Sequence, residues 1–326
     1  MNPERKNVVV FRALPEDLLA RIAAKHAVTV ADPRRPEELA RFRDALPQAH
    51  GLIGSSFKIG AAEIAAAPVL QVVSSISVGV DNYDLAALKA RGITLCHTPG
   101  VLNETTADTV FALIMASSRR LVELSNHVRE GRWTRNIGED LFGWDVHGKT
   151  LGVLGFGRIG QAVARRAALG FGMPVLYHNL DAVNVPDLAG RVTHAPLDEV
   201  LQRADIVALT LPLMPETRGL MGAREFALMK PGAIFVNGSR GPIVQEPALL
   251  AALDSGHLRA AGLDVFEVEP LPMDSALRTH PKVTPLPHIG SATHETRRAM
   301  AELATDNLLR ALAGDTPSAT FNLGSV

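Results

Sequence analysis

The sequence has a single cysteine, Cys96, no long apolar run and no excess of charge of either sign. One cysteine cannot form a disulfide within the chain, and the start MNPERKNVVVF offers too short an apolar run for a signal peptide. We therefore expect a cytoplasmic protein. Runs such as Val110–Ala116 fall far short of the ~20 residues that cross a bilayer, so no membrane span is expected.

The charges nearly cancel, because 33 basic and 34 acidic side chains give a net charge of -1. They are dispersed along the chain, which argues against a field strong enough to hold nucleic acid or an anionic membrane. A small molecule is the expected partner, and we expect no metal site. The 326 residues are 47% hydrophobic, enough for two cores at the usual ~100–200 residues per domain.

The first hundred residues alternate short apolar runs with amphipathic helical patterns. The expected strands are NVVVF, VTV, GLIGS, LQVVSSI and ITLCH, and the expected helices between them are PEDLLARIAAKH, PEELARFRDAL, AAEIAAA and LAALKARG. Strands that alternate with helices of this length indicate parallel βαβ units. The fold class is therefore α/β, with a doubly wound parallel sheet of five strands in this part.

Residues 103–130 lack glycine and proline and carry an apolar side, which predicts one long helix. A polar segment with two tryptophans follows, and then a second alternation of strands and helices, from TLGVLGF at residue 150 to VTPLP at residue 287. This predicts a second parallel α/β unit. Residues 291–314 form a last helical pattern that we expect to pack back on the first domain.

The stretch GVLGFGRIGQ carries the pattern G-x-G-x-x-G. The pattern alone is weak, because glycine-rich turns occur wherever the backbone needs positive φ or close approach. Here it follows a strand and opens a helix, which is the setting that a dinucleotide-binding turn requires. The expected cofactor contacts are Gly155, Phe156, Gly157, Arg158, Ile159 and Gly160.

The end of the next strand bears on the choice between NAD and NADP. An acid there would bind the adenosine ribose and exclude a 2′-phosphate, but the residue is Asn179. Asp181 follows about twenty residues after the third glycine and could reach the ribose. No arginine for a 2′-phosphate stands beside it. The choice between NAD and NADP stays open, with Asn179 and Asp181 as expected contacts.

Three polar residues follow expected strands, where ligands gather in open parallel sheets. Arg240 in VNGSRG can grip a carboxylate with two parallel hydrogen bonds, which suits an α-keto acid. His288 in PLPHIG can donate a proton near neutral pH, and a carboxylate such as Glu269 would orient it and favour its charged form. Taken singly, each is more often a surface or structural residue; together, in the order Arg, Glu, His, they predict an active site.

The whole chain resembles the D-isomer-specific 2-hydroxyacid dehydrogenases. The resemblance rests on ISVGVDN, HTPGVLNETTADT, GKTLGVLGFGRIGQ, MKPGAIFVNGSRGPIV, AAGLDVFEVEPLP and PHIGSATHETR. Within the family it is most similar to bacterial glyoxylate/hydroxypyruvate reductases of the 2-ketogluconate reductase type, through RWTRNIGEDLFGWDVHGKT and GFGMPVLYHN among others. This implies hydride transfer from NAD(P)H to C2 of glyoxylate, hydroxypyruvate or 2-ketogluconate, giving the D-2-hydroxy acid.

The resemblance also implies residue roles. Arg240 would bind the substrate carboxylate and carbonyl oxygen, His288 would protonate that oxygen, and Glu269 would keep His288 charged. Asp264 would bind the nicotinamide carboxamide, and the backbone amides of Val78 and Gly79 would bind the substrate carboxylate.

The implied architecture is a flavodoxin-like substrate-binding domain (residues 1–101 and 292–326) and a Rossmann dinucleotide-binding domain (residues 102–291), with the active site in the cleft between them. The family is commonly homodimeric, with the long helix and the segment of Trp133 and Trp144 at the interface. Whether the partner's tryptophans reach the active site, or only fill core or interface space, stays open.

Other functions remain possible on this fold. Some members act as nicotinamide-nucleotide-sensing co-regulators that bind protein partners, which would show itself in tails or a binding surface. Phosphoglycerate dehydrogenase is a nearer alternative, although its larger forms append a regulatory domain. NADP-using relatives tend to have arginine where this chain has Leu180 or Asp181, and NAD-using ones have aspartate where it has Asn179, so the family patterns leave the cofactor open as well.

Overall fold

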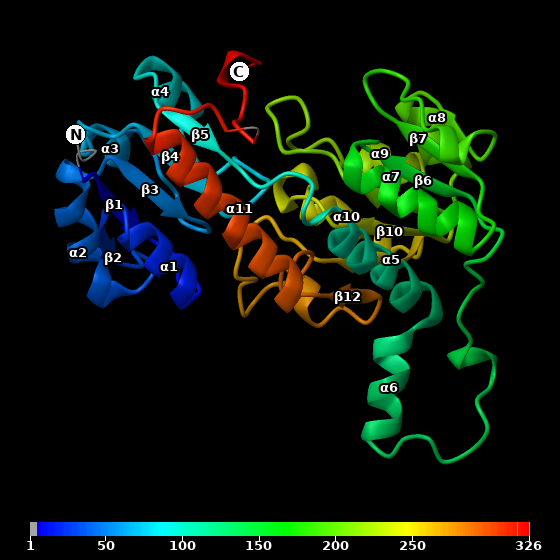
Figure 1. The fold of residues 1–326 in the computed structure, drawn as a ribbon. Coiled ribbons are helices and arrows are strands. Elements are labelled where there is room, and N and C mark those ends of the chain that lie inside the picture. Colours follow the sequence, from blue (N-terminus) through cyan, green and yellow to red (C-terminus); the bar gives the residue numbers. More distant parts are fainter. Residues whose placement is uncertain (1–4, 318, 326) are drawn as a thin grey trace. The chain divides into compact units, whose positions relative to one another are not determined.

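The computed structural model describes residues 5–317 and 319–325. The chain divides into two compact units: unit 1 comprises the residues up to Leu102 together with those from Ala292 onward, and unit 2 comprises Asn103–Ser291. Both units are built on parallel sheets, as predicted (Figure 1). Among the residues described, none of the helices has the length and apolar character that a membrane crossing demands.

Unit 1 is built on a five-stranded parallel sheet in the order β2-β1-β3-β4-β5, the flavodoxin-like order. Its strands are β1 (Asn7–Val10), β2 (Ala27–Val30), β3 (Gly51–Gly54), β4 (Val72–Ser75) and β5 (Thr94–Cys96). All residues of β3 and β4 are buried, as expected for a parallel sheet that helices cover on both faces. The five strands predicted from the sequence are therefore confirmed.

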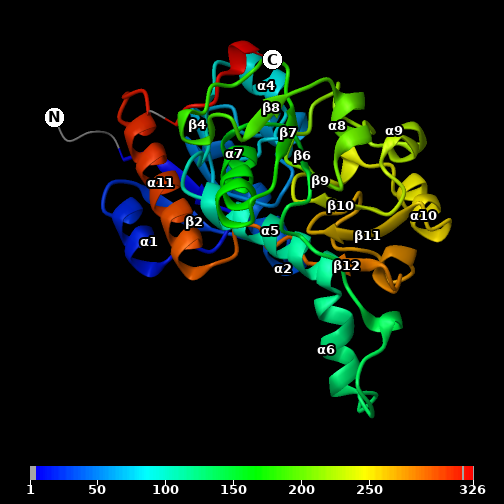
Figure 2. The same cartoon turned by 90° about the vertical axis from the view of Figure 1, so that its right-hand side faces the viewer.

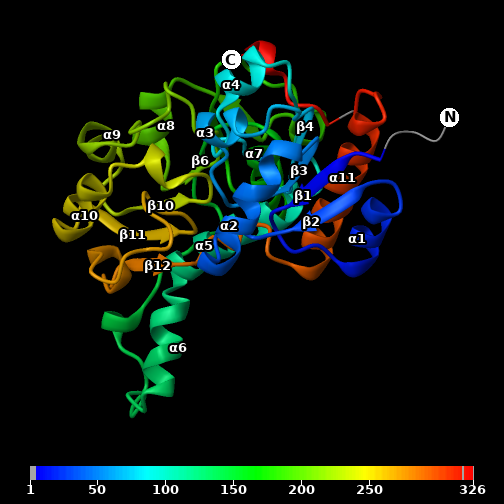
Figure 3. The same cartoon turned by 90° about the vertical axis from the view of Figure 1, so that its left-hand side faces the viewer.

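The helices of unit 1 are α1 (Glu16–Ala23), α2 (Pro36–Ala45), α3 (Ala61–Ala65), α4 (Leu85–Ala90) and α11 (His294–Leu312), with the short turns η1 (Leu46–Gln48) and η7 (Leu323–Ser325). Helix α11 packs on β3, β4 and β5 and lies beside α1 (Figures 2 and 3). Ser74 of β4 donates to the Ala304 carbonyl of α11 at 2.7 Å. The prediction that the last long helix returns to the first domain is thus confirmed.

Unit 2 contains a seven-stranded parallel sheet in the order β12-β11-β10-β9-β6-β7-β8. The strands are β6 (Leu151–Leu154), β7 (Val175–His178), β8 (Val192–His194), β9 (Ile206–Leu209), β10 (Ala233–Asn237), β11 (Leu258–Leu263) and β12 (Val283–Pro285). Strands β6 to β11 form the doubly wound dinucleotide-binding order, which reverses between β6 and β9. Strand β8 is an addition to the predicted elements.

Helices cover both faces of this sheet. They are α5 (Asn103–Arg119), α6 (Leu121–Arg129), α7 (Arg158–Arg165), α8 (Leu197–Arg203), α9 (Ala223–Leu228) and α10 (Glu246–Asp254), with the short turns η2 (Glu139–Leu141), η3 (Arg166–Gly170), η4 (Pro186–Leu188), η5 (Gly241–Ile243) and η6 (Ala276–Arg278). Helices α5 and α7 lie on one face and α8, α9 and α10 on the other (Figures 2 and 3). Each face has its own apolar core.

The prediction of one long helix over residues 103–130 is wrong, because the helix breaks at Arg120. This residue has the left-handed backbone angles φ 54° and ψ 35°. The carbonyl of Ser118 accepts from the Trp144 N–H at 2.9 Å, and the Arg120 guanidinium donates to the Asp140 carbonyl at 2.6 Å. The returning segment thus bonds to the helix end, and α6 leaves in a new direction (Figure 1).

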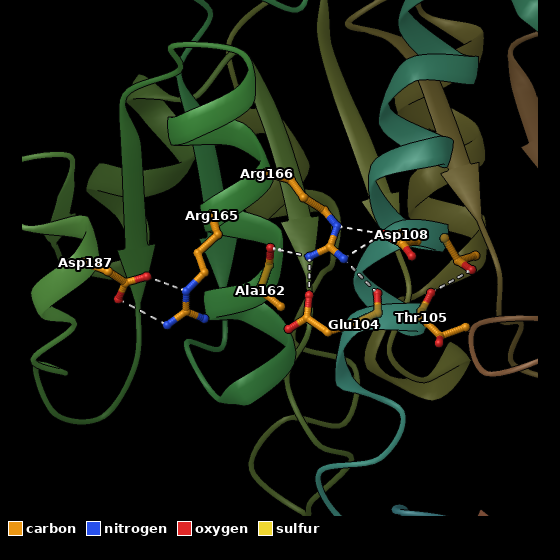
Figure 4. Close-up of polar contacts among 8 residues, drawn as sticks. Glu104, Thr105, Asp108, Ala162, Arg165, Arg166 and Asp187 are labelled. Atoms are coloured by element: carbon orange, nitrogen blue, oxygen red, sulfur yellow. Dashed lines mark hydrogen bonds and ion pairs between the residues drawn. The ribbon is translucent and has the colours of Figure 1, made fainter. Parts of the chain in front are cut away.

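Helix α7, which follows the glycine turn, is fixed to α5 by charged contacts (Figure 4). The Arg166 guanidinium, just after α7, contacts Asp108 at 2.6 Å and the Glu104 carboxylate at 2.9 Å, both from α5. It also donates to the Ala162 carbonyl at 2.9 Å, while Arg165 pairs with Asp187 at 2.6 Å. One guanidinium therefore joins the two helices on this face.

Candidate active site

Each of the three positions in the turn after β6 is a glycine for a different structural reason. Gly155 has φ +93°, and a Cβ there would lie 2.7 Å from the Leu211 nitrogen. A Cβ at Gly160 would overlap the carbonyl oxygen of Gly155, so α7 starts tightly against the turn. At Gly157 a Cβ would meet nothing within 4 Å, which leaves open space over the backbone for a ligand.

The first turn of α7 suits an anion. Helix α7 begins at Arg158, and no side chain caps its N-terminus. Its first N–H groups therefore lack helical partners and can donate to a phosphate, with the helix dipole in favour. Together with the open space at Gly157, this fits the pyrophosphate of a dinucleotide.

Two residues that were predicted to contact the cofactor, Phe156 and Ile159, pack their side chains in or against the apolar core. Phe156 is 1% exposed, and its ring stacks on Tyr177 at 3.8 Å between centroids. Ile159 packs against the same core. The Phe156 side chain therefore cannot contact the cofactor, and its N–H donates to the Asn179 side chain.

At the end of β7, Asn179 ties the glycine turn to the next loop. Its Oδ1 accepts from the Phe156 N–H at 3.3 Å, and its Nδ2 donates to the Asp181 carbonyl at 3.1 Å. Leu180 and Asp181, which follow it, are exposed, Leu180 by 96%. The charge of Asp181, which bears on the choice between NAD and NADP, thus lies in solvent just after the strand.

Arg240 lies on a loop that a buried asparagine holds. Asn237, the last residue of β10, is 1% exposed. Its Oδ1 accepts from the Ser239 N–H at 3.0 Å, and its Nδ2 donates to the Arg240 carbonyl at 3.1 Å. A Cβ at Gly241 would overlap the backbone of Phe266, so the Arg240 loop lies directly against the loop that leads to Glu269.

Glu269 and His288 form a close pair. The His288 Nδ1 lies 2.7 Å from the Glu269 Oε2, and the other carboxylate oxygen accepts from the Phe266 N–H at 3.0 Å. Burial raises the pKa of Glu269, but the hydrogen bond and charge of His288, the Phe266 N–H and the Arg240 charge outweigh it, so the pKa lies below its ordinary value. The carboxylate therefore stays ionised around neutral pH, and the bond leaves Nε2 of His288 for a substrate.

Asp264 holds the loop of His288. Its carboxylate, in a residue that is 2% exposed, accepts from the Ile289 N–H at 2.7 Å and the Gly290 N–H at 2.8 Å. Its carbonyl accepts from the His288 N–H at 2.9 Å. Burial raises the pKa of Asp264 despite these two N–H donors. His288 has φ 53°, a left-handed conformation that these three bonds maintain.

In unit 1, the loop after β4 presents two adjacent backbone amides. Val78 and Gly79 are partly exposed, and neither N–H donates a hydrogen bond within the described residues. Adjacent unpaired N–H groups can bind a carboxylate. The loop is therefore chemically suited to the role expected of it.

The structure brings Arg240, Asp264, Glu269 and His288 to the carboxyl ends of β10, β11 and β12, the edge that also carries the glycine turn after β6. Sequence reasoning missed Asn237, although an asparagine that ends an apolar strand before Gly-Ser is a turn signal. A cavity of about 360 Å³ lies elsewhere, lined by Trp144, Lys149, Lys230 and Arg259 among others, and contains none of these side chains.

The sequence model of the D-isomer specific 2-hydroxyacid dehydrogenase NAD binding domain matches residues 111–290. The chain belongs to the D-isomer specific 2-hydroxyacid dehydrogenases. Glyoxylate/hydroxypyruvate reductase B of Klebsiella pneumoniae (strain 342) is 51% identical over 311 residues, 95% of this chain and 96% of the relative. The enzyme of the same name from Citrobacter koseri is 51% identical over 310 residues, with the same coverage.

Solved structures of the family have the same fold. The NADPH-dependent glyoxylate/hydroxypyruvate reductase of Sinorhizobium meliloti, in complex with NADP and malonate, has a TM-score of 0.87 and 30% identity over 98% of both chains. A glyoxylate reductase from Paecilomyes thermophila has a TM-score of 0.88 and 29% identity over 98% of this chain and 99% of its own. This dehydrogenase is accordingly an NAD(P)-dependent oxidoreductase of 2-keto and 2-hydroxy acids, and unit 2 contains its NAD-binding domain.

Proposed function

We propose that this dehydrogenase reduces glyoxylate and hydroxypyruvate, with 2-ketogluconate as a third substrate of the same head group. Its relatives named glyoxylate/hydroxypyruvate reductase B support the substrate class. All three acids share the 2-keto acid head and differ in the tail. A tenfold preference among them corresponds to only ~1.4 kcal/mol, which small changes in the surrounding loops can supply.

The geometry at the strand ends supports the following residue roles. The glycine turn would hold the cofactor and Asp264 would bind its carboxamide; when bound, the cofactor would supply a hydride for C2 of the keto acid. Arg240 binds the carboxylate and the carbonyl oxygen through its planar guanidinium. His288 gives the proton on Nε2 to that oxygen, and Glu269 holds the imidazole through Nδ1. The amides of Val78 and Gly79 bind the substrate carboxylate.

The pair of His288 and Glu269 at 2.7 Å is the observation that carries the proposal. An imidazole that an ionised carboxylate holds through Nδ1 can give a proton to the substrate oxygen and take one up again between turnovers. Exchange of His288 for glutamine removes the proton but keeps a polar side chain. Since general acids typically contribute ~10²–10⁴-fold, His288→Gln should lower kcat by at least a hundredfold.

The test follows the absorbance of NADH and of NADPH with each of the three keto acids. His280→Gln is a matched control, because His280 also pairs with a carboxylate, Asp254, at 3.3 Å. That variant should keep its kcat. Turnover by His288→Gln within about tenfold of the original enzyme would exclude His288 as the general acid.

A homodimer and a cytoplasmic location are part of the same proposal. Helix α6 has no buried residue, and it extends away from the sheet of unit 2 in every view (Figures 1, 2 and 3). On it and the segment that follows, apolar side chains are exposed, namely Leu121, Val122, Val128, Trp133, Ile137, Phe142 and Trp144. An apolar surface of this kind on a projecting element is typical of a subunit interface.

Sedimentation of the purified enzyme tests the dimer. Val128 is 54% and Trp133 61% exposed, so Val128→Glu with Trp133→Glu should leave unit 2 folded and shift the enzyme to a monomer. A monomer at micromolar concentration before any substitution would contradict the proposal.

A further inference from the structure

Beyond the carboxyl ends of β4 and β5, the two chain segments stay side by side in unit 1. The Thr98 N–H donates to the Ser77 carbonyl at 3.0 Å, and the Ile76 N–H donates to the Gly54 carbonyl at 2.9 Å. Residues 76 and 77 are therefore hydrogen-bonded to the neighbouring segments on both sides. The side chain of His97 extends this contact to Val78.

The Nδ1 of His97 lies 3.0 Å from the Val78 carbonyl oxygen. A carbonyl oxygen only accepts, so Nδ1 of His97 carries the hydrogen and donates it. Because the peptide unit is planar and trans, the direction of the Val78 carbonyl fixes the opposite direction of the Gly79 N–H. The imidazole thus sets the direction of the Gly79 N–H, one of the two unpaired amides of the loop.

His97 is itself held on three sides. Its backbone N–H donates to the Ala319 carbonyl at 3.1 Å, and its carbonyl accepts from Nδ2 of Asn307, a residue 2% exposed, at 3.1 Å. The Phe321 ring meets the imidazole edge-on at 5.5 Å. Such fixation from α11 and from the chain after it limits the positions that the imidazole can adopt.

We propose that His97 is a positioning residue, which aims the Gly79 N–H at the substrate carboxylate by holding the Val78 carbonyl. The inference rests on the proposed function, in which this loop binds the keto acid head. His97 touches neither substrate nor cofactor; it acts through the peptide between Val78 and Gly79. Its contribution therefore falls on substrate binding more than on the chemical step.

Two variants of His97 separate the hydrogen bond from the space that the ring fills. In His97→Asn the amide nitrogen stands as many bonds from Cα as Nδ1 does, so the donor is kept. His97→Leu removes it in a side chain of similar reach. We expect KM for glyoxylate to rise about tenfold in the leucine variant, equivalent to about 1.4 kcal/mol, and less than threefold in the asparagine variant. A loss of uniform binding leaves kcat nearly unchanged.

His50→Leu is the matched control. The Nδ1 of His50 also bonds to the backbone of unit 1, accepting from the Asn7 N–H at 3.2 Å, but at the opposite end of the sheet. The His50→Leu variant should lower the stability of the enzyme without a change in KM. Hydrogen exchange of the Ile76 and Thr98 amides, whose hydrogen bonds hold this segment, gives a readout besides activity, and it should accelerate in His97→Leu alone.

Equal KM values for the leucine and asparagine variants, with unchanged hydrogen exchange, would overturn the role of His97 and leave the proposed reductase function unaffected. If the original enzyme turns over none of the keto acids, the proposed function fails, and this role fails with it. Accelerated exchange without any rise in KM would show that the Gly79 amide does not bind the carboxylate, and would also overturn the inference.

Discussion

The pair of Glu269 and His288 makes a quantitative prediction for Glu269→Gln. Glutamine keeps one oxygen that can accept from Nδ1 of His288, but it loses the negative charge and the second acceptor, which serves the Phe266 N–H. Hydrogen bonds to charged groups contribute about 1.5–3 kcal/mol. The two side chains are 34% and 46% exposed, so solvent screens the pair and the lower value applies. Since about 1.4 kcal/mol is tenfold in rate, kcat at pH 7 should fall about tenfold.

The pH profile of Glu269→Gln should change on its acidic side. The pKa of Glu269 lies below its ordinary value, so the carboxylate supports His288 above that pKa and ceases to do so as the pH falls through it. Glutamine does not titrate, so this acidic decline should disappear.

The assay is kcat for glyoxylate from pH 4 to 10 with saturating cofactor. Glu267→Gln removes the same charge from the same loop and is the control, because Glu267 is exposed and uses its backbone N–H to contact Glu246. It should behave like the original enzyme. Equal rates for Glu269→Gln and Glu267→Gln at every pH would refute the reasoning that Glu269 supports the proton donor.

Three further predictions concern binding. Arg240→Ala should raise KM for the keto acid about a hundredfold, equivalent to about 3 kcal/mol for a charged pair, while fluorescence titration shows unchanged cofactor affinity; equal loss of both would indicate a structural role. Asp181→Arg should raise the ratio of kcat/KM for NADPH over NADH about tenfold, and an unchanged ratio would place residue 181 away from the ribose. Gly157→Ala should weaken cofactor binding without a change in melting temperature. Gly160→Ala should lower both the cofactor affinity and the melting temperature, because only the Cβ at residue 160 collides with the protein. Normal cofactor binding by Gly157→Ala would contradict a pyrophosphate at this turn.

Most of the fold was predictable because periodicity and strand-helix alternation are local properties. Strand β8 was missed because its three residues, Val192–His194, form only a short edge strand with no apolar run. The break at Arg120 was missed for another reason. Its left-handed backbone is held by contacts with Asp140 and the Trp144 segment, which lie 20 or more residues along the chain, and no glycine or proline announces it.

The charged residues of the site were predictable because parallel strands bring their carboxyl ends to one edge. The hydrogen bonds that hold Arg240 and His288 in place along that edge were not predictable. The carboxylate of Asp264 was expected to serve only the cofactor, whereas both of its oxygens bond to the backbone after His288. Such bonds depend on where two loops meet in space, and neither spacing nor composition encodes that.

Asn237 and Asp264 occupy equivalent places, at the ends of the neighbouring strands β10 and β11, and the Asp264 N–H donates to the Asn237 carbonyl at 2.9 Å. Each buried side chain bonds to the backbone of a loop that carries a residue of the site, Arg240 in one case and His288 in the other. These two residues are thus held through their backbone rather than only through side-chain contacts. For this reason, loss of the charge at Arg240 or Glu269 should change binding and proton transfer while the loops persist, so that the kinetics of these variants report chemistry and not unfolding.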